Sequence, residues 1–260
     1  MQFISIIVTI WHREVLRYSR DRTRIFLTIF QPLMFLFIFG SGLRHAFASG
    51  NLGIDFIQFM YPGILAVSIM GVSFYSTIST IWDREFGFLK EILVAPVSRT
   101  AIIIGKASGA VTIALSQALV LLLIAPLLNI KIYFIMIPEL IMFMMLLSFC
   151  IAGMGLLMAT LLRTIENFGV LMNIIVFPMF FLSGAFFPLH SIPLWMTIFS
   201  RINPLTYAVD AFRHIILSPQ ISTDIAKNIF LNPMYINAIY LFIFSILMVL
   251  SASIMFNKKG

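Results

Sequence analysis

Few residues in this sequence are of types that could catalyse a reaction or bind a metal. The four histidines, His12, His45, His190 and His214, are spread along the chain and show no metal-ligand spacing. A hydrolase needs a nucleophile with a base close by, and the sequence offers no such arrangement. His214 follows Asp210 by four residues, which favours a local contact on a helix. We therefore expect no catalytic residue and no metal site, and the sequence argues against an enzyme.

The sequence contains a single Gly-Lys pair that could belong to a phosphate-binding loop, Gly105-Lys106. A nucleotide-binding phosphate loop has the pattern Gly-x-x-x-x-Gly-Lys-Ser/Thr, in which backbone amides hold the phosphates. Here Thr100 stands where the first glycine is required, and Ala107 replaces the final Ser or Thr. We expect that the chain does not bind ATP in this way and holds no cofactor of its own.

Ionisable groups within apolar stretches would indicate a carrier driven by an ion gradient, because such groups are costly in a bilayer. The long apolar stretches of this chain have no carboxylate at mid-depth. Glu139 lies near the start of one of them, where it either faces a helix N-terminus or lines a pathway. Glu166 and Arg163 are expected to form a solvated pair. The pattern favours an external source of energy, with an ion-gradient-driven secondary transporter as the alternative.

The composition places most of the chain in a membrane. Hydrophobic residues make up 61% and charged residues 10%, and the mean hydropathy is +1.05. A helix needs about 20 apolar residues to cross the hydrocarbon core. Six stretches without Asp, Glu, Lys or Arg meet this need, at 25–43, 56–81, 107–128, 140–162, 167–189 and 228–257. They are apolar on every face, which indicates helices. We predict an all-α polytopic membrane protein, with one transmembrane domain over 1–260 and six transmembrane helices.

The distribution of basic residues predicts the orientation. With six crossings, both termini lie on the same side of the membrane. Twelve lysines and arginines then lie on that side, and five lie on the other: Arg44, Lys131, Arg201, Arg213 and Lys227. The positive-inside rule makes the richer side cytoplasmic. We therefore expect a protein of the cell membrane with both termini in the cytoplasm. The net charge of +7 then reflects topology and contact with lipid headgroups, and it does not indicate nucleic acid.

Residues 1–24 resemble a helix that lies in the cytoplasmic interface. Apolar residues recur at steps of three and four, while arginines fall toward the other side. The apolar set comprises Ile4, Ile7, Trp11, Val15 and Tyr18. The alternative is a basic flank that only sets the orientation of the first crossing.

The loop at 82–99 is longer than a connector between two crossings requires. It carries apolar residues at helical spacing, namely Phe86, Leu89, Ile92 and Leu93, and Pro96 ends the pattern. The spacing predicts a short helix that presents an apolar face in the cytoplasm. A solvated or lipid-resting loop is the alternative.

An outer segment at 182–217 follows the fifth predicted crossing. Asn203-Pro204 is a good N-cap and first-turn pair, and Leu205, Ala208, Val209, Phe212 and Ile216 then share one helical face. Before it, a cluster of residues that break helices predicts an interruption of the fifth crossing: Pro178, Ser183, Gly184 and Pro188. A kinked crossing with a structured outer loop is the alternative.

Two of these segments resemble motifs of the ABC type-2 exporter permeases, and the resemblance covers nearly the whole chain. The inner motif is Asp83-Arg-Glu-Phe-Gly-Phe-Leu-Lys-Glu-Ile-Leu-Val-Ala-Pro-Val-Ser-Arg99, followed by Gly105-Lys106. The outer motif joins Leu182-Ser-Gly-Ala-Phe-Phe-Pro188 to Asn203-Pro-Leu-Thr-Tyr-Ala-Val-Asp-Ala-Phe-Arg213. The sequence departs from the family pattern at Phe88 and Lys90, where a small polar and an acidic residue are common.

The resemblance implies roles for three sets of residues. The inner loop would be a coupling helix that docks on an ATPase subunit, through Asp83, Glu85, Phe86, Gly87, Leu89, Glu91, Leu93 and Pro96. The outer set would form a re-entrant helical pair: Ser183, Gly184, Phe187, Pro188, Asn203, Pro204, Tyr207, Asp210 and Arg213. Crossings one, two and five would line a substrate path, with the candidates Phe35, Phe39, Phe177, Phe180 and Phe181.

The resemblance also implies the partners. Two copies of an ABC ATPase subunit would bind ATP and Mg²⁺, and a second permease chain, identical or similar, would face this one. Such an exporter would move amphipathic or lipid-like cargo, such as a drug, lipid or glycan, out of the cytoplasm.

Overall fold

The computed structural model describes residues 2–42, 56–87, 98–162, 164–187, 189, 192–221, 226 and 229–259. Within these residues all regular structure is helical, as the sequence predicts. The longer helices are α1 (Gln2–Arg20), α2 (Arg22–Gly42), α4 (Phe56–Ser76), α7 (Arg99–Ile124), α8 (Ile137–Leu161), α9 (Ile165–Leu182) and α13 (Met234–Lys259). The shorter elements are α5 (Ser79–Glu85), α10 (Leu194–Ile202), α11 (Pro204–Leu217) and the 3-10 turns η1 (Ala125–Leu128), η2 (Phe134–Met136) and η4 (Ser218–Gln220).

Five helical segments of the described residues are long and apolar enough to cross a membrane. They are Phe56–Glu85, Arg99–Leu128, Phe134–Leu161, Ile165–Leu182 and Met234–Lys258. Each overlaps one of the predicted apolar stretches, so the chain is a multi-pass membrane protein. Helix α2, which overlaps the predicted first crossing, is not among the five.

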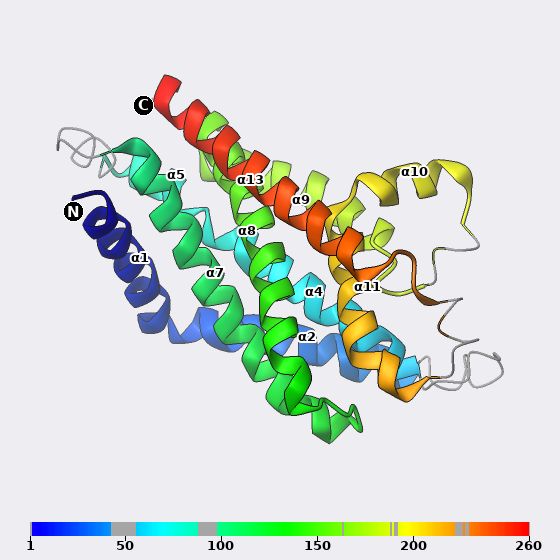
Figure 1. Cartoon of the computed structure of the whole chain (residues 1–260). Coiled ribbons are helices and arrows are strands. Elements are labelled where there is room, and N and C mark those ends of the chain that lie inside the picture. The colour runs from blue at the N-terminus through cyan, green and yellow to red at the C-terminus, as the bar shows by residue number, and fades with distance from the viewer. Residues whose placement is uncertain are drawn as a thin grey trace.

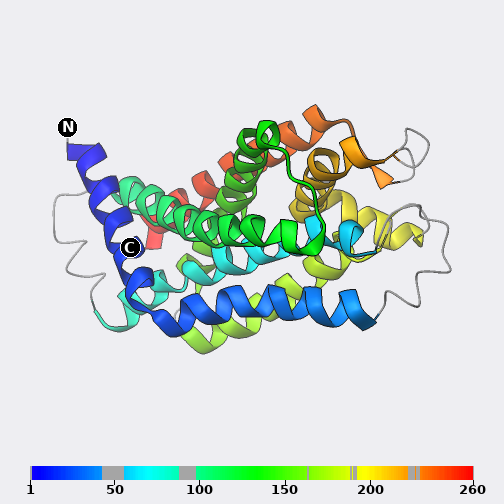
Figure 2. The same cartoon turned by 90° about the horizontal axis from the view of Figure 1, so that it is seen from below.

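The helices are arranged so that the two ends of the bundle differ (Figure 1). The N-terminus, the C-terminus and α5 lie at one end, which we call the terminus end. Helices α10 and α11 lie at the opposite end, which we call the far end. Figure 2 shows α2 running lengthwise beside α4, and α2 also packs against α7.

Helix α4 forms the centre of the bundle, and α9 lies at its edge. In the most apolar 18-residue stretch of the segment formed by α4 and α5, 78% is buried. In the corresponding stretch of α9, only 6% is buried. Helix α4 packs against α2, α7, α8 and α11. Hydrogen bonds join it to its neighbours: the Tyr61 hydroxyl donates to the Leu121 carbonyl at 2.9 Å, and the Ser73 and Ser148 hydroxyls lie 2.7 Å apart. Such bonds fix helix pairs where no water competes.

Small residues allow the closest contacts between elements. A Cβ atom on Gly63 of α4 would lie 2.6 Å from the carbonyl oxygen of Ala185, in the segment that follows α9. A Cβ on Gly109 of α7 would lie 2.7 Å from the Cβ of Glu14 in α1. Because these positions carry no side chain, α4 can approach the segment after α9 closely, and α1 can approach α7 closely. Small residues have this role between membrane helices.

The N-terminal segment forms the predicted helix, but its apolar stripe is used differently from the interfacial prediction. Helix α1 packs against α7, and the Trp11 indole N–H donates to the Thr112 hydroxyl at 2.8 Å. Ile10 and Tyr18 are buried, whereas Ile4 is 68% exposed. The part of the apolar face around Ile4 is therefore left uncovered by this chain, and the interfacial position of α1 stays a prediction.

We predict that Gly63→Ala destabilises the protein, because the added methyl group would meet the backbone of Ala185, which cannot rotate away. Overpacking of this kind costs about 1–3 kcal/mol. Thermal unfolding of the purified protein in detergent should show a lower midpoint than that of the wild type.

Gly71 in the same helix is the matched control, since nothing lies within 4 Å of the position of an added Cβ. Gly71→Ala should keep the midpoint or raise it slightly, because alanine is the better helix former. Equal loss of stability in both variants would contradict the close contact at Gly63.

Candidate functional site

The second crossing ends at the terminus end in a short, separate helix. A turn at Thr77 and Ile78 separates α4 from α5, and α5 ends at Glu85. Gly87 follows with φ +80°, and its N–H donates to the Arg84 carbonyl at 3.2 Å. A glycine with positive φ just after a helix is a common stop signal. The chain therefore leaves the direction of α5 at the start of the predicted coupling segment.

Four charged side chains from three helices meet beside α5, and we call them the ion cluster: Arg13 and Glu14 of α1, Asp83 of α5 and Lys106 of α7. The ammonium of Lys106 lies 2.6 Å from Asp83 Oδ2 and 3.3 Å from Glu14 Oε1. Arg13 bonds to Asp83 and lies 3.0 Å from Glu14 Oε1. Lys106 also donates to the Ser79 hydroxyl at 3.2 Å.

Three of the four residues of the ion cluster are buried, namely the two carboxylates and Lys106. The exposed fractions are 5% for Glu14, 5% for Asp83 and 3% for Lys106. Burial alone would raise the pKa of Glu14, but Lys106 and Arg13 outweigh it and lower that pKa from 4.5 to about 2. The Glu14 carboxylate is thus held in its charged form, as buried charges in pairs are.

Two further arginines tie the terminus end together. Arg84 donates to the Leu162 carbonyl at 2.8 Å, just past the C-terminal end of α8. Arg99, the first residue of α7, donates to the Asn257 carbonyl near the end of α13 at 2.9 Å. Cations suit helix C-termini because the last carbonyls lack partners. Helices α5, α7, α8 and α13 are therefore joined at this end by charge as well as by packing.

The residues predicted to meet an ATPase fall into two groups. Glu85 is exposed, and Phe86 is 74% exposed although it is large and apolar. Asp83 faces the ion cluster, so its carboxylate points into this chain. The remaining predicted contacts, Leu89, Glu91, Leu93 and Pro96, lie outside the described residues, and the predicted helix there stays a prediction.

The far end contains the predicted break in the chain after α9. The helix ends at Leu182, and Gly184 has φ +74°. The Ser183 hydroxyl donates to the Phe180 carbonyl at 2.7 Å and accepts the Ala185 N–H at 3.2 Å. The break frees backbone carbonyls in this apolar region, and each of these needs a partner.

Ser200 of α10 and Asn203, which lies between α10 and α11, supply partners for two of those carbonyls. The Asn203 amide donates to the Met179 carbonyl at 2.7 Å, while its oxygen accepts the N–H of Leu205. Asn203 is therefore both the predicted N-cap of α11 and a link to α9. Ser200 of α10 donates to the Leu182 carbonyl at 2.6 Å. The five residues predicted to share one face of α11 are all buried.

Arg213 holds the segment that follows the break. Its guanidinium donates to the carbonyls of Gly184 and Ala185, at 2.6 and 3.2 Å, and lies 4.0 Å from the ring centre of Phe59. Only 2% of the residue is exposed. The contact with Phe59 of α4 adds an attraction between a cation and an aromatic ring. One side chain thus joins α11, α4 and the segment after α9.

Asp210 and Tyr207 connect α11 to α13 and to the residues just before α13. Asp210 accepts hydrogen bonds from the N–H groups of Leu231 and Asn232, at 2.8 and 3.0 Å, and from the Asn237 amide at 2.8 Å. Tyr207 stacks on Tyr240 with ring centres 3.8 Å apart. Of the other residues predicted here, Pro204 begins α11 and Phe187 is half-buried, while Pro188 lies outside the described residues.

The predicted pathway phenylalanines are only partly on one surface. Phe177 and Phe181 are exposed on α9, 58% and 51%. Phe180 faces α2, with its ring centre 6.2 Å from that of Phe35. The side chain of Phe39 lies outside the described residues. Together Phe177 and Phe181 form an exposed aromatic edge on α9.

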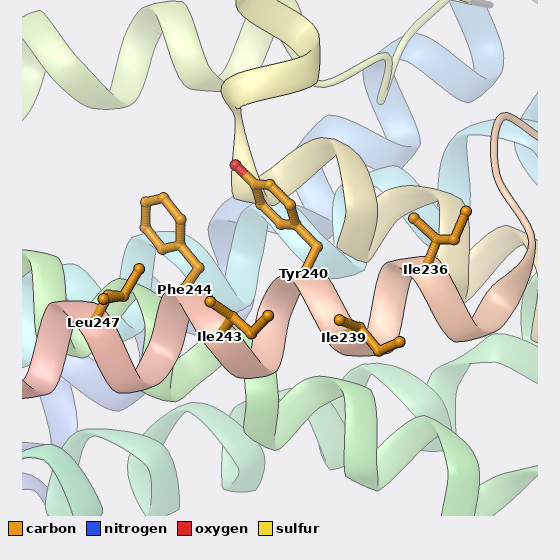
Figure 3. Close-up of a pocket in the computed structure, with 6 residues that line it drawn as sticks. All are labelled: Ile236, Ile239, Tyr240, Ile243, Phe244 and Leu247. Atoms are coloured by element: carbon orange, nitrogen blue, oxygen red, sulfur yellow. The ribbon is translucent and has the colours of Figure 1, made fainter.

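A shallow groove of about 330 Å³ lies on α13 (Figure 3). Its lining is almost entirely apolar and comes from this one helix: Ile236, Ile239, Tyr240, Ile243, Phe244 and Leu247. Four of these side chains are also among the exposed apolar residues that face outward. Such a surface suits lipid chains or another membrane helix, and it offers no group for recognising polar cargo.

Sequence reasoning did not identify the partners within the ion cluster. Lys106 belongs to the incomplete phosphate-loop pattern, to the inner motif and to the basic residues of the inner side, and none of these patterns predicts a contact with Glu14. A signal was present, because Glu14 is the only carboxylate among the first 20 residues and Lys106 adjoins a long apolar stretch. Charges in such places usually have partners.

We predict that the depressed pKa of Glu14 makes stability depend on pH. A carboxylate with a lowered pKa contributes stability above its ordinary value of 4.5, and the contribution is lost as pH falls toward about 2. Unfolding midpoints in detergent, measured across this range, should fall more steeply for the wild type than for Glu14→Gln. Glu166→Gln, at an exposed glutamate, should keep the wild-type slope.

We also predict that Asn203→Ala destabilises the far end, because the change removes the cap of α11 and leaves the Met179 carbonyl without its donor. The expected loss is about 1–2 kcal/mol in the free energy of unfolding. Asn167→Ala, at an exposed residue of α9, is the control and should change stability by less than about 0.5 kcal/mol. Equal effects would contradict the role of Asn203.

Comparison with known proteins places this architecture in a family. Residues 6–217 match the model of the ABC-2 type transporter family. The chain is 32% identical over 216 residues to ycf38 of Cyanophora paradoxa, which bears the name transport permease, covering 82% of this chain and 74% of that protein. Over 185 residues it is 30% identical to YbhR of Escherichia coli K12, named as a multidrug ABC transporter permease, covering 68% of this chain and 48% of YbhR.

A third relative is the inner membrane transport permease YadH of Escherichia coli K12, with 24% identity over 212 residues, 79% of this chain and 80% of YadH. The match to the family model runs from α1 through α11, and it includes the ion cluster and the break after α9. The chain therefore belongs to the ABC-2 type transporter family, as a membrane-spanning permease subunit.

Proposed function

We propose that this chain is the transmembrane subunit of an ATP-driven exporter in the cell membrane, with six crossings in one domain and both termini cytoplasmic. Helix α2 would be the sixth crossing. Its 21 residues span about 30 Å, it lies lengthwise beside α4, and its exposed side chains include Phe26, Phe30 and Phe37. The excess of basic residues at the terminus end supports this orientation.

The contact with the ATPase would lie at the terminus end. The single observation that carries this proposal is Phe86, a large apolar residue that is 74% exposed at the start of the family's inner motif. One exposed apolar residue is common on protein surfaces, so the weight of this observation comes from the position of Phe86 within that motif. Glu85 would join it, together with Leu89, Glu91, Leu93 and Pro96 from the remainder of the loop. Asp83 would contribute indirectly, by holding α5 in place through Lys106.

Two copies of the ATPase subunit would bind ATP and Mg²⁺, and their closure would push on this loop. Membership of the ABC-2 type transporter family and the lack of a phosphate-loop motif in this sequence support a separate ATPase. Movement of the loop would then favour one arrangement of the transmembrane helices over another.

A second permease chain, identical or similar, would cover α9. This helix is apolar and almost unburied, and its aromatic edge faces away from the bundle. A pathway between two such chains would be lined by α2, α4 and α9 and would suit amphipathic or lipid-like cargo. Residues 182–217, held by Asn203 and Arg213, would form the re-entrant pair that closes the exit.

Affinity purification of the tagged chain from its native membranes in mild detergent tests this function. Recovery of a stoichiometric ATP-binding subunit, with ATP hydrolysis in the eluate, is the expected result. A pure permease oligomer that moves cargo in response to an ion gradient would overturn the proposal and favour a secondary transporter.

We predict that Glu85→Arg weakens the contact with the ATPase, because it reverses an exposed charge beside Phe86. Like charges across an interface cost several kcal/mol, so recovery of the ATPase should fall by about tenfold or more. Glu139→Arg changes an exposed glutamate at the far end and should leave recovery unchanged. The two variants can be compared in one purification experiment.

A further inference from the structure

We propose that Lys106 is the positioning residue through which the coupling loop, α1 and α7 move together. This inference rests on the proposed function. Nucleotide-driven displacement of the loop would move α5, α1 and α7 as one unit, and through α7 reach the far end, while Lys106 bridges Asp83 and Glu14.

The geometry of the ion cluster supports a mechanical connection. Lys106 contacts Asp83 and Ser79 of α5 on one side and Glu14 of α1 on the other. Asp83 lies only four residues before Gly87, where the coupling loop begins. A shift at the start of the loop therefore acts on Asp83, and the Asp83 to Lys106 contact of 2.6 Å keeps α5 in step with α7, which begins at Arg99 after the loop.

Contacts along α7 lead from the ion cluster toward the far end. Near its other end, the Leu121 carbonyl accepts the Tyr61 hydroxyl of α4. Two residues further along α4, Gly63 touches the backbone of Ala185, which Arg213 also holds. Packed helices and hydrogen bonds of this kind can carry coupling between distant sites when the elements have two arrangements.

The burial of Lys106 also supports a role for this residue in coupling. A buried ion pair contributes little net stability compared with well-packed apolar residues, whereas removal of one partner leaves an uncompensated charge. A cluster that served packing alone could be replaced by apolar side chains without loss of function. The decisive test is therefore a variant that keeps the fold and the charge balance but lacks the bridge.

The double variant Glu14→Met with Lys106→Met meets this need. It removes one negative and one positive charge, and Asp83 keeps its contacts with Arg13 and Arg17. The close packing of α1 on Gly109 does not involve the replaced polar atoms. The matched control is Ser73→Ala with Ser148→Ala, which removes another buried polar contact between two helices.

The readout is movement at the far end, which requires no knowledge of the cargo. Each variant carries the reporter Phe187→Cys and Cys150→Ala, so that the natural cysteine does not react. The complex with its co-purifying ATPase is reconstituted in nanodiscs. Labelling by a membrane-impermeant maleimide is measured without nucleotide and after trapping with ATP and vanadate, and the melting temperature is recorded for each variant.

We expect nucleotide trapping to change the labelling rate by about tenfold in the reference protein and in the serine control. In the double variant this change should fall severalfold, although the ATPase still co-purifies and the melting temperature stays near that of the control. Lys106→Arg, which keeps the cation, should retain most of the change. If the double variant does not assemble, Glu14→Gln serves instead and should reduce the change, because it removes the charge that attracts Lys106 to α1 and leaves the Lys106 to Asp83 contact in place.

A full nucleotide-dependent change in the double variant would overturn the role of Lys106 and leave the proposed function intact. A reference protein that assembles with its ATPase but never changes its labelling would overturn both.

Discussion

Hydrocarbon offers no hydrogen bonds, so each polar group that this chain takes into the bilayer must find its partner within the protein. The break after α9 shows the consequence most clearly. An uninterrupted helix would satisfy its own carbonyls, but here those of Met179 and Leu182 are met by side chains of Asn203 and Ser200. Helices α10 and α11 are thus positioned by the needs of the segment they cover, and Arg213 completes the arrangement. The far end is held together by side chains bonded to backbone.

The same constraint acts on charges at the terminus end. Glu14, Asp83 and Lys106 are all nearly fully buried, and each has at least one partner of opposite charge from another helix. The cluster joins the amphipathic first helix, the end of the second crossing and the start of the third. Just beyond it, Glu85 and Phe86 are exposed. A firmly held cluster beside these exposed residues would be a suitable arrangement for receiving force at the proposed ATPase contact.

Packing within the single chain is uneven. Helix α4 buries most of its surface within the chain, whereas α9 buries little of its apolar surface. In lipid an exposed apolar helix carries no penalty, so exposure alone does not make a monomer unstable. The uneven burial, together with membership of a family whose members work as subunits, is consistent with a chain that completes its pathway by assembly. The aromatic edge at Phe177 and Phe181 belongs to the surface that such assembly would cover.

Local composition was sufficient for the helical class, for the positions of five apolar crossings and for the N-cap of α11 at Asn203, because these depend on residues close together in sequence. The break after α9 also followed from local glycine, serine and proline. The partners of individual polar groups did not. Lys106 lies 23 and 92 residues from its two carboxylates, and Arg213 lies 29 from the carbonyl of Gly184. Only the folded chain brings such groups together, because hydropathy and spacing describe one helix at a time and contain no information about which faces of remote helices meet.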